Sequence, residues 1–163
     1  HPHVFNNVDL DMSQFEKTWE ELKRDEKGET SITSGLKRIP NHLPALIKAE
    51  KIQHKAALIG FDWDDIKDVF EKIDEEYKEL LDECKQGNIK YIKEELGDLL
   101  FSIVNLARFL HIDSEEALNL TNQKFINRFE FMEENASKLH KKLEDLTLDQ
   151  MEELWQSAKK NKL

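Results

Sequence analysis

The stretch from residue 99 to residue 107 has the sequence Leu99-Leu100-Phe101-Ser102-Ile103-Val104-Asn105-Leu106-Ala107 and contains no charged side chain. Charged residues make up 36% of the whole chain, so this run differs sharply from its surroundings. A helix that is apolar nearly all the way round is typical of a central, buried element. We therefore expect a helix over about residues 89–110 whose middle lies in the core of the protein.

A second periodic segment precedes this run. Between Asp62 and Cys84, apolar side chains recur at spacings of three and four, which predicts a helix with one apolar face that is capped by Asp62. The dipeptide Gly87-Asn88 predicts a short turn, so the two helices should be neighbours. The apolar positions are Ile66, Val69, Phe70, Ile73, Tyr77, Leu80, Leu81 and Cys84.

The same reading predicts helices in most of the remaining chain, over about residues 11–27, 43–59, 113–141 and 148–160. Thr147 followed by Gln150 matches a capping box for the last of them. The polar segment 28–40 is expected to be a loop, and residues 1–7 an extended arm. No segment has the pattern of a strand. We expect an all-α helical bundle with an amino-terminal arm, helix and loop over 1–40 and a folded domain over 41–163.

Composition excludes several classes of protein. A net charge of −10 and a pI near 5.1 oppose binding to a nucleic-acid polymer, because phosphate contacts need a basic face. A single cysteine, Cys84, rules out a disulfide within the chain and favours a reducing, cytoplasmic location. No apolar run reaches the length of a membrane span, and no signal-peptide pattern is found. We therefore expect a cytoplasmic protein with no membrane partner.

Two pairs of carboxylates carry the chemistry. Glu76 and Glu79 are three apart beside the apolar face of one predicted helix, and Glu95 and Asp98 repeat this spacing at the entry to the uncharged run. Asp98 is therefore expected to be partly enclosed. If the helices pack together, the four side chains converge and repel one another unless cations neutralise them. Magnesium, which prefers oxygen ligands, meets this need, although an acidic pair alone is more often a solvated helix face.

Two pairs of residues further along the chain are possible phosphate and base contacts. Lys124 and Arg128 are four apart on one predicted helix, and Trp155 and Lys159 are four apart on the last. Ordinary surface charge explains the cations equally well, and Trp155 fits a core position. Their functional interpretation is a triphosphate clamp, with arginine as a planar fork and lysine as a point charge.

These motifs resemble the EExxE and ExxD signature of the MazG-type nucleoside triphosphate pyrophosphohydrolase family. The similarity covers about residues 40–160. It is found at Leu43-Pro44-Ala45-Leu46, Gly60-Phe61-Asp62-Trp63, Glu75-Glu76-x-x-Glu79, Glu94-Glu95-Leu96-Gly97-Asp98-Leu99-Leu100-Phe101, Val104-Asn105-Leu106-Ala107-Arg108, Asn122-x-Lys124-Phe125-x-x-Arg128-Phe129 and Met151-Glu152-x-Leu154-Trp155-Gln156. The opening His1-Pro2-His3-Val4-Phe5 is similar to the end of a preceding domain in two-domain members, so we expect the carboxy-terminal MazG domain.

The resemblance implies hydrolysis of nucleoside triphosphates to the monophosphate and pyrophosphate by a homodimeric helical bundle. It implies Mg²⁺, for which Mn²⁺ can substitute, bound by four carboxylates, and nucleotide contacts from four downstream residues. Glu75 or Glu79 is the candidate for orienting or deprotonating the attacking water. The expected metal ligands are Glu76, Glu79, Glu95 and Asp98, and the expected nucleotide contacts are Lys124, Arg128, Trp155 and Lys159.

Three alternatives remain open from the sequence. A pyrophosphatase selective for one deoxynucleotide, such as dCTP or dUTP, would share the carboxylates and differ in its base contacts. A non-catalytic interaction module would present the same amphipathic helices without metal-dependent activity. A di-iron bundle expects Glu-x-x-His pairs, and neither carboxylate pair here ends in histidine.

Overall fold

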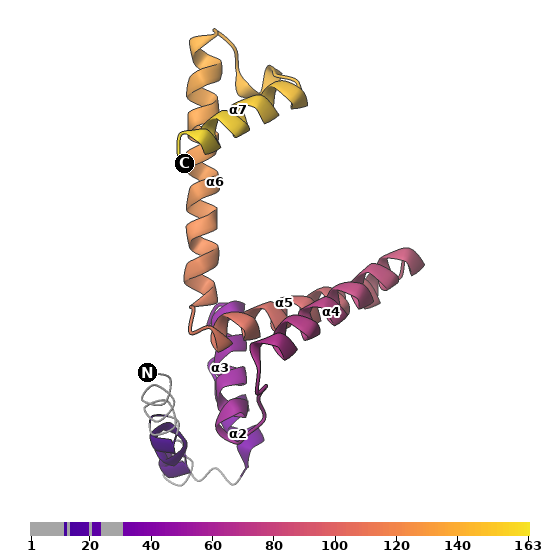
Figure 1. Cartoon of the computed structure of the whole chain (residues 1–163), viewed down its shortest axis with the longest axis vertical. Coiled ribbons are helices and arrows are strands. Elements are labelled where there is room, and N and C mark those ends of the chain that lie inside the picture. The colour runs from indigo at the N-terminus through magenta and orange to yellow at the C-terminus, as the bar shows by residue number, and fades with distance from the viewer. Residues whose placement is uncertain (1–11, 13, 20, 24–30) are drawn as a thin grey trace. The chain divides into compact units, whose positions relative to one another are not determined.

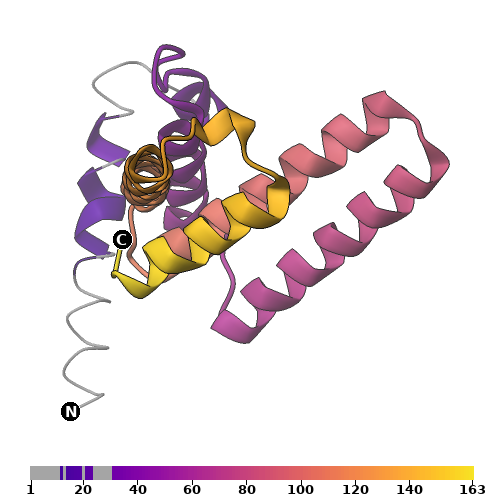
Figure 2. The same ribbon diagram turned by 90° about the horizontal axis from the view of Figure 1, so that it is seen from above.

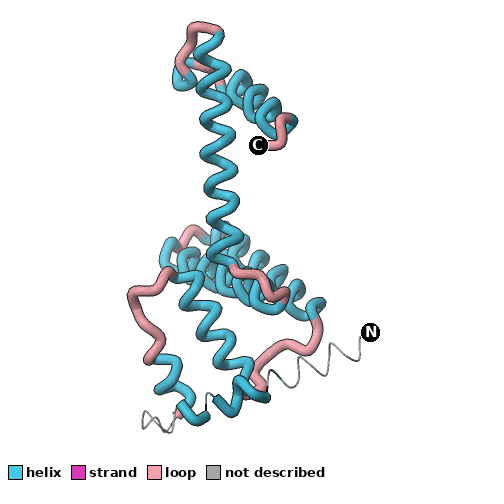
Figure 3. Tube along the Cα trace, turned by 90° about the vertical axis from the view of Figure 1, so that its left-hand side faces the viewer, coloured by secondary structure: helices cyan, strands magenta, loops and turns pink. Residues whose placement is uncertain are grey.

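The computed structural model describes residues 12, 14–19, 21–23 and 31–163. Over these residues the chain consists of helices and loops, and none of them forms a strand (Figures 1 and 3). The all-α prediction is therefore confirmed. The elements are α2 (Ile32–Lys37), α3 (Ala45–Leu58), α4 (Ile66–Gln86), α5 (Ile89–Phe109), α6 (Ser114–Lys138), the 3₁₀ helix η1 (Leu143–Asp145) and α7 (Leu148–Lys160).

The chain divides into two compact units. The first is His1–Ser114 and holds α2 to α5, and the second is Glu115–Leu163 and holds η1, α7 and nearly all of α6. The boundary predicted near residue 40 stays a prediction. The expected arm over residues 1–7 lies outside the described residues, as does much of the helix expected over 11–27, of which residues 12, 14–19 and 21–23 are helical.

Helices α4 and α5 pack side by side as an antiparallel pair (Figures 1 and 2). Gly87 ends α4 with a φ of 80°, a left-handed conformation that glycine adopts without steric cost. Asn88 then caps α5, because its side-chain oxygen accepts a hydrogen bond from the Lys90 backbone N–H at 3.1 Å. The predicted turn is confirmed, and it places the two carboxylate pairs on neighbouring helices.

Two contacts fix the other side of α5. Helix α3 packs against it, and the buried side chain of Gln53 donates a hydrogen bond from Nε2 to the backbone oxygen of Phe101 at 2.8 Å. In the loop before α4, Asp62 accepts a hydrogen bond of 2.6 Å from Arg108 near the end of α5. Together these contacts hold α5 between α3 and the start of α4.

Two predicted boundaries are wrong. The cap of α4 is Asp65, whose side chain accepts from the Lys67 backbone N–H at 3.0 Å, while Asp62 binds Arg108 instead. Helix α2 lies inside the segment predicted as a loop. Its cap is Ser31, whose side-chain oxygen accepts from the Ser34 backbone N–H at 3.1 Å. Both capping hydrogen bonds, those of Asp65 and Ser31, depend on the backbone conformation, so only the structure identifies them.

The expected burial of the middle of α5 is only partly observed. Ser102 and Val104 are buried, but Leu100, Phe101 and Ile103 are 50%, 45% and 45% exposed. Among the described residues of the first unit, the helices that pack extensively against α5 are α3 and α4. Two helices cover less than the full circumference of a third, so α3 and α4 leave one side of α5 uncovered.

The second unit forms around the carboxy-terminal helix. The capping box of α7 is confirmed, because Thr147 and Gln150 each accept a hydrogen bond from the other's backbone N–H. Met132 and Ala136 of α6 and Ala158 of α7 are buried. Within the part of the chain that the structure describes, no helix is long and apolar enough to cross a membrane.

Candidate functional site

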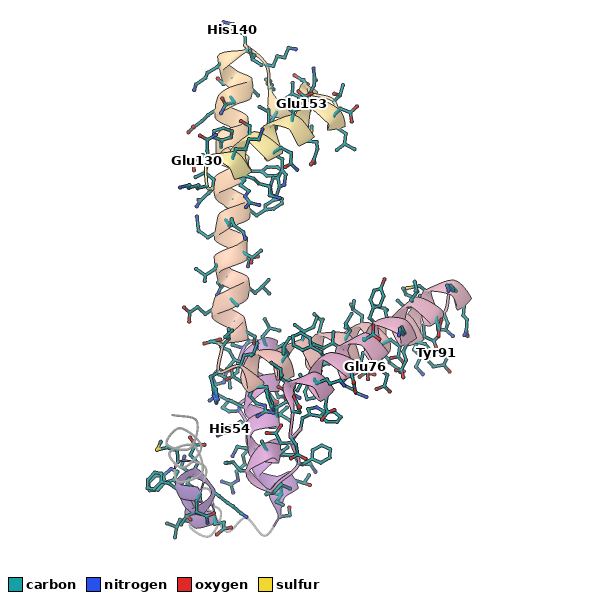
Figure 4. The ribbon with its side chains drawn as sticks, in the orientation of Figure 1. His54, Glu76, Tyr91, Glu130, His140 and Glu153 are labelled. Atoms are coloured by element: carbon teal, nitrogen blue, oxygen red, sulfur yellow. The ribbon has the colours of Figure 1, made fainter. Side chains whose placement is uncertain are left out.

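Three glutamates from two helices converge at the α4–α5 contact. Glu76 and Glu79 of α4 and Glu95 of α5 each place a carboxylate oxygen within 4.8 Å of the other two, and we call this set the acidic triad. Figure 4 labels Glu76 in the stretch of α4 that runs alongside α5. The three-residue spacing places Glu76 and Glu79 on one side of α4, and the antiparallel pairing brings Glu95 opposite them.

Two oxygens of the acidic triad lack partners. Glu76 is 6% exposed, Glu95 is half-buried and Glu79 is exposed. The Oε2 atoms of Glu76 and Glu95 are buried and accept no hydrogen bond from any described residue. A buried carboxylate oxygen without a donor is costly, and a bound cation would remove that cost. The residues therefore fit a metal ion on the geometry of this chain alone.

The protonation of Glu95 follows from its surroundings. Burial raises the pKa of its carboxyl group, and hydrogen bonding to Glu79 raises it further. The negative charges of Glu79, Asp98 and Glu76 add to the increase in this pKa. The acidic triad thus holds a proton more tightly than isolated glutamates do when no cation is present.

Asp98 differs from its predicted position. It is exposed rather than partly enclosed, and it lies outside the acidic triad. Its charge nevertheless contributes to the raised pKa of Glu95, so the two groups are close enough to interact. A Cβ atom added at Gly97 would meet no atom within 4 Å, so packing around this position does not require glycine.

Lys72 is a residue of the site that the sequence interpretation missed. Its Nζ lies 2.9 Å from Oε1 of Glu76 and 3.5 Å from Oε2 of Glu75. The hydrogen bond to Glu76 raises the pKa of the Lys72 ammonium group. The i,i+4 spacing of Lys72 and Glu76 was the available signal, because side chains four apart on a helix are neighbours.

The second unit holds the four predicted nucleotide-binding residues. Lys124 and Lys159 are exposed, while Arg128 and Trp155 are half-buried and touch each other. The guanidinium carbon of Arg128 lies 4.9 Å from the centroid of the Trp155 ring, a cation–π arrangement. Phe125 packs at 5.3 Å from the same ring, and Arg128 also donates from Nε to the Leu163 backbone oxygen at 2.6 Å.

The ligand set of the acidic triad indicates which metals it suits. It offers only carboxylate oxygens, and no histidine or cysteine belongs to it. Hard cations such as Mg²⁺ and Mn²⁺ prefer such ligands, whereas zinc sites usually contain nitrogen or sulfur. Fold and site together define an all-α protein with a candidate centre for a hard divalent cation.

Comparison with known proteins identifies a domain within the chain. Residues 65–132, which span α4, α5 and most of α6, match the MazG nucleotide pyrophosphohydrolase domain. The match contains all three members of the acidic triad and Asp98. The chain therefore contains a MazG domain.

Its relatives are longer proteins. The nucleoside triphosphate pyrophosphohydrolase/pyrophosphatase MazG of Thermotoga maritima is 45% identical over 159 residues, covering 98% of this chain and 60% of the relative. The nucleoside triphosphate pyrophosphohydrolase of Escherichia coli K12 is 39% identical over 166 residues, which cover 100% of this chain and 63% of the relative. The uncharacterized protein YabN of Bacillus subtilis is 45% identical over 161 residues, which cover 98% of this chain and 33% of the relative. The chain thus spans about three fifths of the first two.

The raised pKa of Glu95 predicts a pH-dependent gain in stability for Glu95→Gln in EDTA. An acid with a raised pKa in the folded state loses stability as pH rises through that pKa. The metal-free variant should therefore be more stable than the wild type at pH 7. The difference should shrink to nothing as pH falls below about 4.3, the usual value for glutamate.

Urea unfolding at a series of pH values measures this difference. Glu94→Gln serves as the control, because Glu94 is exposed on the same helix and lies outside the acidic triad. A wild type that is as stable as Glu95→Gln at pH 7 would contradict the electrostatic account of the acidic triad.

Proposed function

We propose that this chain hydrolyses nucleoside triphosphates to the nucleoside monophosphate and pyrophosphate, with Mg²⁺ and across both ribonucleotides and deoxynucleotides. The observation that carries the proposal is the acidic triad with its two unpartnered buried oxygens, in a chain that contains a MazG domain. Two relatives that carry the name nucleoside triphosphate pyrophosphohydrolase support the reaction class.

The charge of the substrate explains the need for the metal. A triphosphate is anionic and this chain carries a net charge of −10, so the two repel each other without a cation between them. We assign Glu76, Glu79, Glu95 and Asp98 as the metal ligands, with Mn²⁺ as a substitute for Mg²⁺. When bound, the metal supplies positive charge to the phosphates and makes a nearby water more acidic.

The carboxylates also determine where a proton is held. Water cleaves the anhydride between the α- and β-phosphates, and the proton that it loses needs an acceptor. Glu79 and Glu75 are the candidates. Both side chains are exposed, but Glu79 belongs to the acidic triad, whereas Glu75 lies outside it and 3.5 Å from Lys72. These contacts favour Glu79 as the group that orients the water and receives its proton.

The second unit is assigned to nucleotide binding. Lys124, Arg128 and Lys159 would bind phosphate oxygens, and Trp155 would stack on the base, which every base permits. Arg128 already lies over the Trp155 ring and donates from Nε to the chain. Its two terminal nitrogens remain for phosphate, and stacking would use the ring face away from the guanidinium.

We further propose that the chain forms a homodimer through an apolar surface of α4 and α5. Three side chains of α4 and three of α5 recur at helical spacing and are each about half exposed. Large exposed apolar surfaces are uncommon on monomeric proteins and mark sites of protein–protein contact. The surface consists of Phe70, Tyr77, Leu81, Leu96, Leu100 and Ile103, which are 51%, 54%, 42%, 46%, 50% and 45% exposed.

The reaction is tested by measuring pyrophosphate and monophosphate release from the eight common NTPs and dNTPs, with Mg²⁺ and with EDTA. Activity should need Mg²⁺, and Glu95→Ala should lower kcat by more than about 100-fold, since even outer partners of a metal ligand are worth about 10–100-fold.

Asp74→Ala is the matched control, because Asp74 lies on α4, pairs with Lys78 at 2.7 Å and is outside the acidic triad. Its activity should stay near wild type. Release from one deoxynucleotide alone would replace broad hydrolysis by a base-selective enzyme. No release from the folded protein with any of the eight would leave a non-catalytic interaction module.

Trp155→Ala tests base stacking within the same panel. Loss of one stacked base is worth about 1–3 kcal/mol, so KM should rise roughly fivefold or more for every triphosphate. Inorganic tripolyphosphate, which has no base, provides the control and should bind both proteins equally. An unchanged KM for all eight nucleotides would remove the stacking role.

The dimer is tested by sedimentation equilibrium of the chain. The mass should be twice the chain mass of 19.2 kDa, and Leu100→Lys should reduce it to one chain because a charge would be buried. Leu148→Lys is the control, since Leu148 is 79% exposed at the start of α7 and outside the surface. A wild type that sediments as a monomer would exclude this surface as a stable interface.

A further inference from the structure

Lys72 makes an ion pair with the most buried member of the acidic triad. It lies one helical turn before Glu76 on α4, and its Nζ is 2.9 Å from Glu76 Oε1. The same ammonium group is 3.5 Å from Glu75 Oε2, so it bridges two successive carboxylates. Its own side chain is 38% exposed, whereas the side chain of Glu76 is 8% exposed.

The two oxygens of the Glu76 carboxylate therefore differ. Oε1 accepts the hydrogen bond from Lys72, and Oε2 is buried without a donor from any described residue. A carboxylate that is held through one oxygen keeps a fixed rotamer, and its second oxygen stays free for another ligand. Within the acidic triad, only Glu76 is held by a lysine at this distance among the described contacts.

We propose that Lys72 is a positioning residue of the metal centre, holding Glu76 through Oε1 so that Oε2 faces the metal. This inference rests on the proposed function, since it assumes that the acidic triad binds a divalent cation. Metal-ligating carboxylates generally accept hydrogen bonds from outer partners, and removal of such a partner lowers metal affinity about 10–100-fold. Lys72 would act through Glu76 and not by touching the metal.

A purely electrostatic role for Lys72 predicts the opposite sign. A positive charge beside the acidic triad repels a divalent cation, so removing it would strengthen metal binding. At 38% exposure, however, the ammonium group is partly solvated, and the high dielectric constant of the surrounding water weakens its repulsion. The hydrogen bond to Oε1 acts at contact distance and keeps its orienting effect. Loss of Lys72 should therefore weaken metal binding despite removing a positive charge.

The chain offers a matched control on the same helix. Lys78 pairs with Asp74 at 2.7 Å with the same four-residue separation, in the reverse order, and both side chains are exposed. Neither belongs to the acidic triad. Replacing Lys78 removes the same charge and the same kind of ion pair from α4 without touching Glu76.

The test is direct binding of Mn²⁺ alone, measured by the electron paramagnetic resonance signal of free Mn²⁺, without nucleotide. Lys72→Met should raise the dissociation constant about tenfold. Lys72→Arg, which keeps the charge and a donor, should restore most of the affinity, and Lys78→Met should match the wild type. Circular dichroism confirms that each variant is folded. Lys72→Ala replaces Lys72→Met with the same expectation if the latter does not fold.

The outcomes separate this inference from the function on which it rests. Wild-type protein that binds no Mn²⁺ would overturn both the metal centre and the role of Lys72. Wild-type binding with equal or stronger binding by Lys72→Met would overturn the positioning role alone and leave the metal centre standing. Equal weakening by Lys78→Met would assign the effect to α4 in general, which also overturns it.

Discussion

Mutual repulsion among carboxylates at the contact between α4 and α5 is the constraint on which the site depends. The acidic triad brings three such groups within 4.8 Å, and one of them, Glu76, is almost fully buried. Without a bound cation the chain offsets this repulsion in two ways, by the ion pair of Lys72 with Glu76 and by the raised pKa of Glu95. A divalent cation would offset it more fully, since it neutralises two charges at once and supplies a partner for the free oxygens.

Packing keeps these groups together. The turn at Gly87 and Asn88 sets α4 and α5 antiparallel, so that Glu95, the one member of the acidic triad on α5, meets the pair on α4. On the other side, Gln53 of α3 and Asp62 of the loop before α4 each hydrogen bond to α5. The helix that carries Glu95 is thus held from two directions, and the position of its carboxylate follows from contacts well outside the site.

The apolar faces of α4 and α5 have a second consequence. Their packing within the first unit leaves large apolar side chains of both helices about half exposed, among them the six of the proposed dimer surface. An interface across this surface would bury the side of α5 that the first unit leaves open. The same two helices would then carry both the metal centre and the subunit contact. A substitution in the subunit contact would therefore also affect the metal centre, and the reverse.

The amino-acid sequence by itself determined the helical class, the turn at Gly87-Asn88, the capping box at Thr147 and the pairing of carboxylates three apart. Each depends on residues close together in the chain, whose spacing alone sets which face of a helix they share. Only the tertiary structure decided that Asp98 is exposed and outside the acidic triad, that Asp65 rather than Asp62 caps α4, and that one side of α5 is open. Those outcomes depend on which distant segment contacts a given side chain. Arg108, for example, binds Asp62 across 46 residues, and the spacing of neighbouring residues does not predict such a contact.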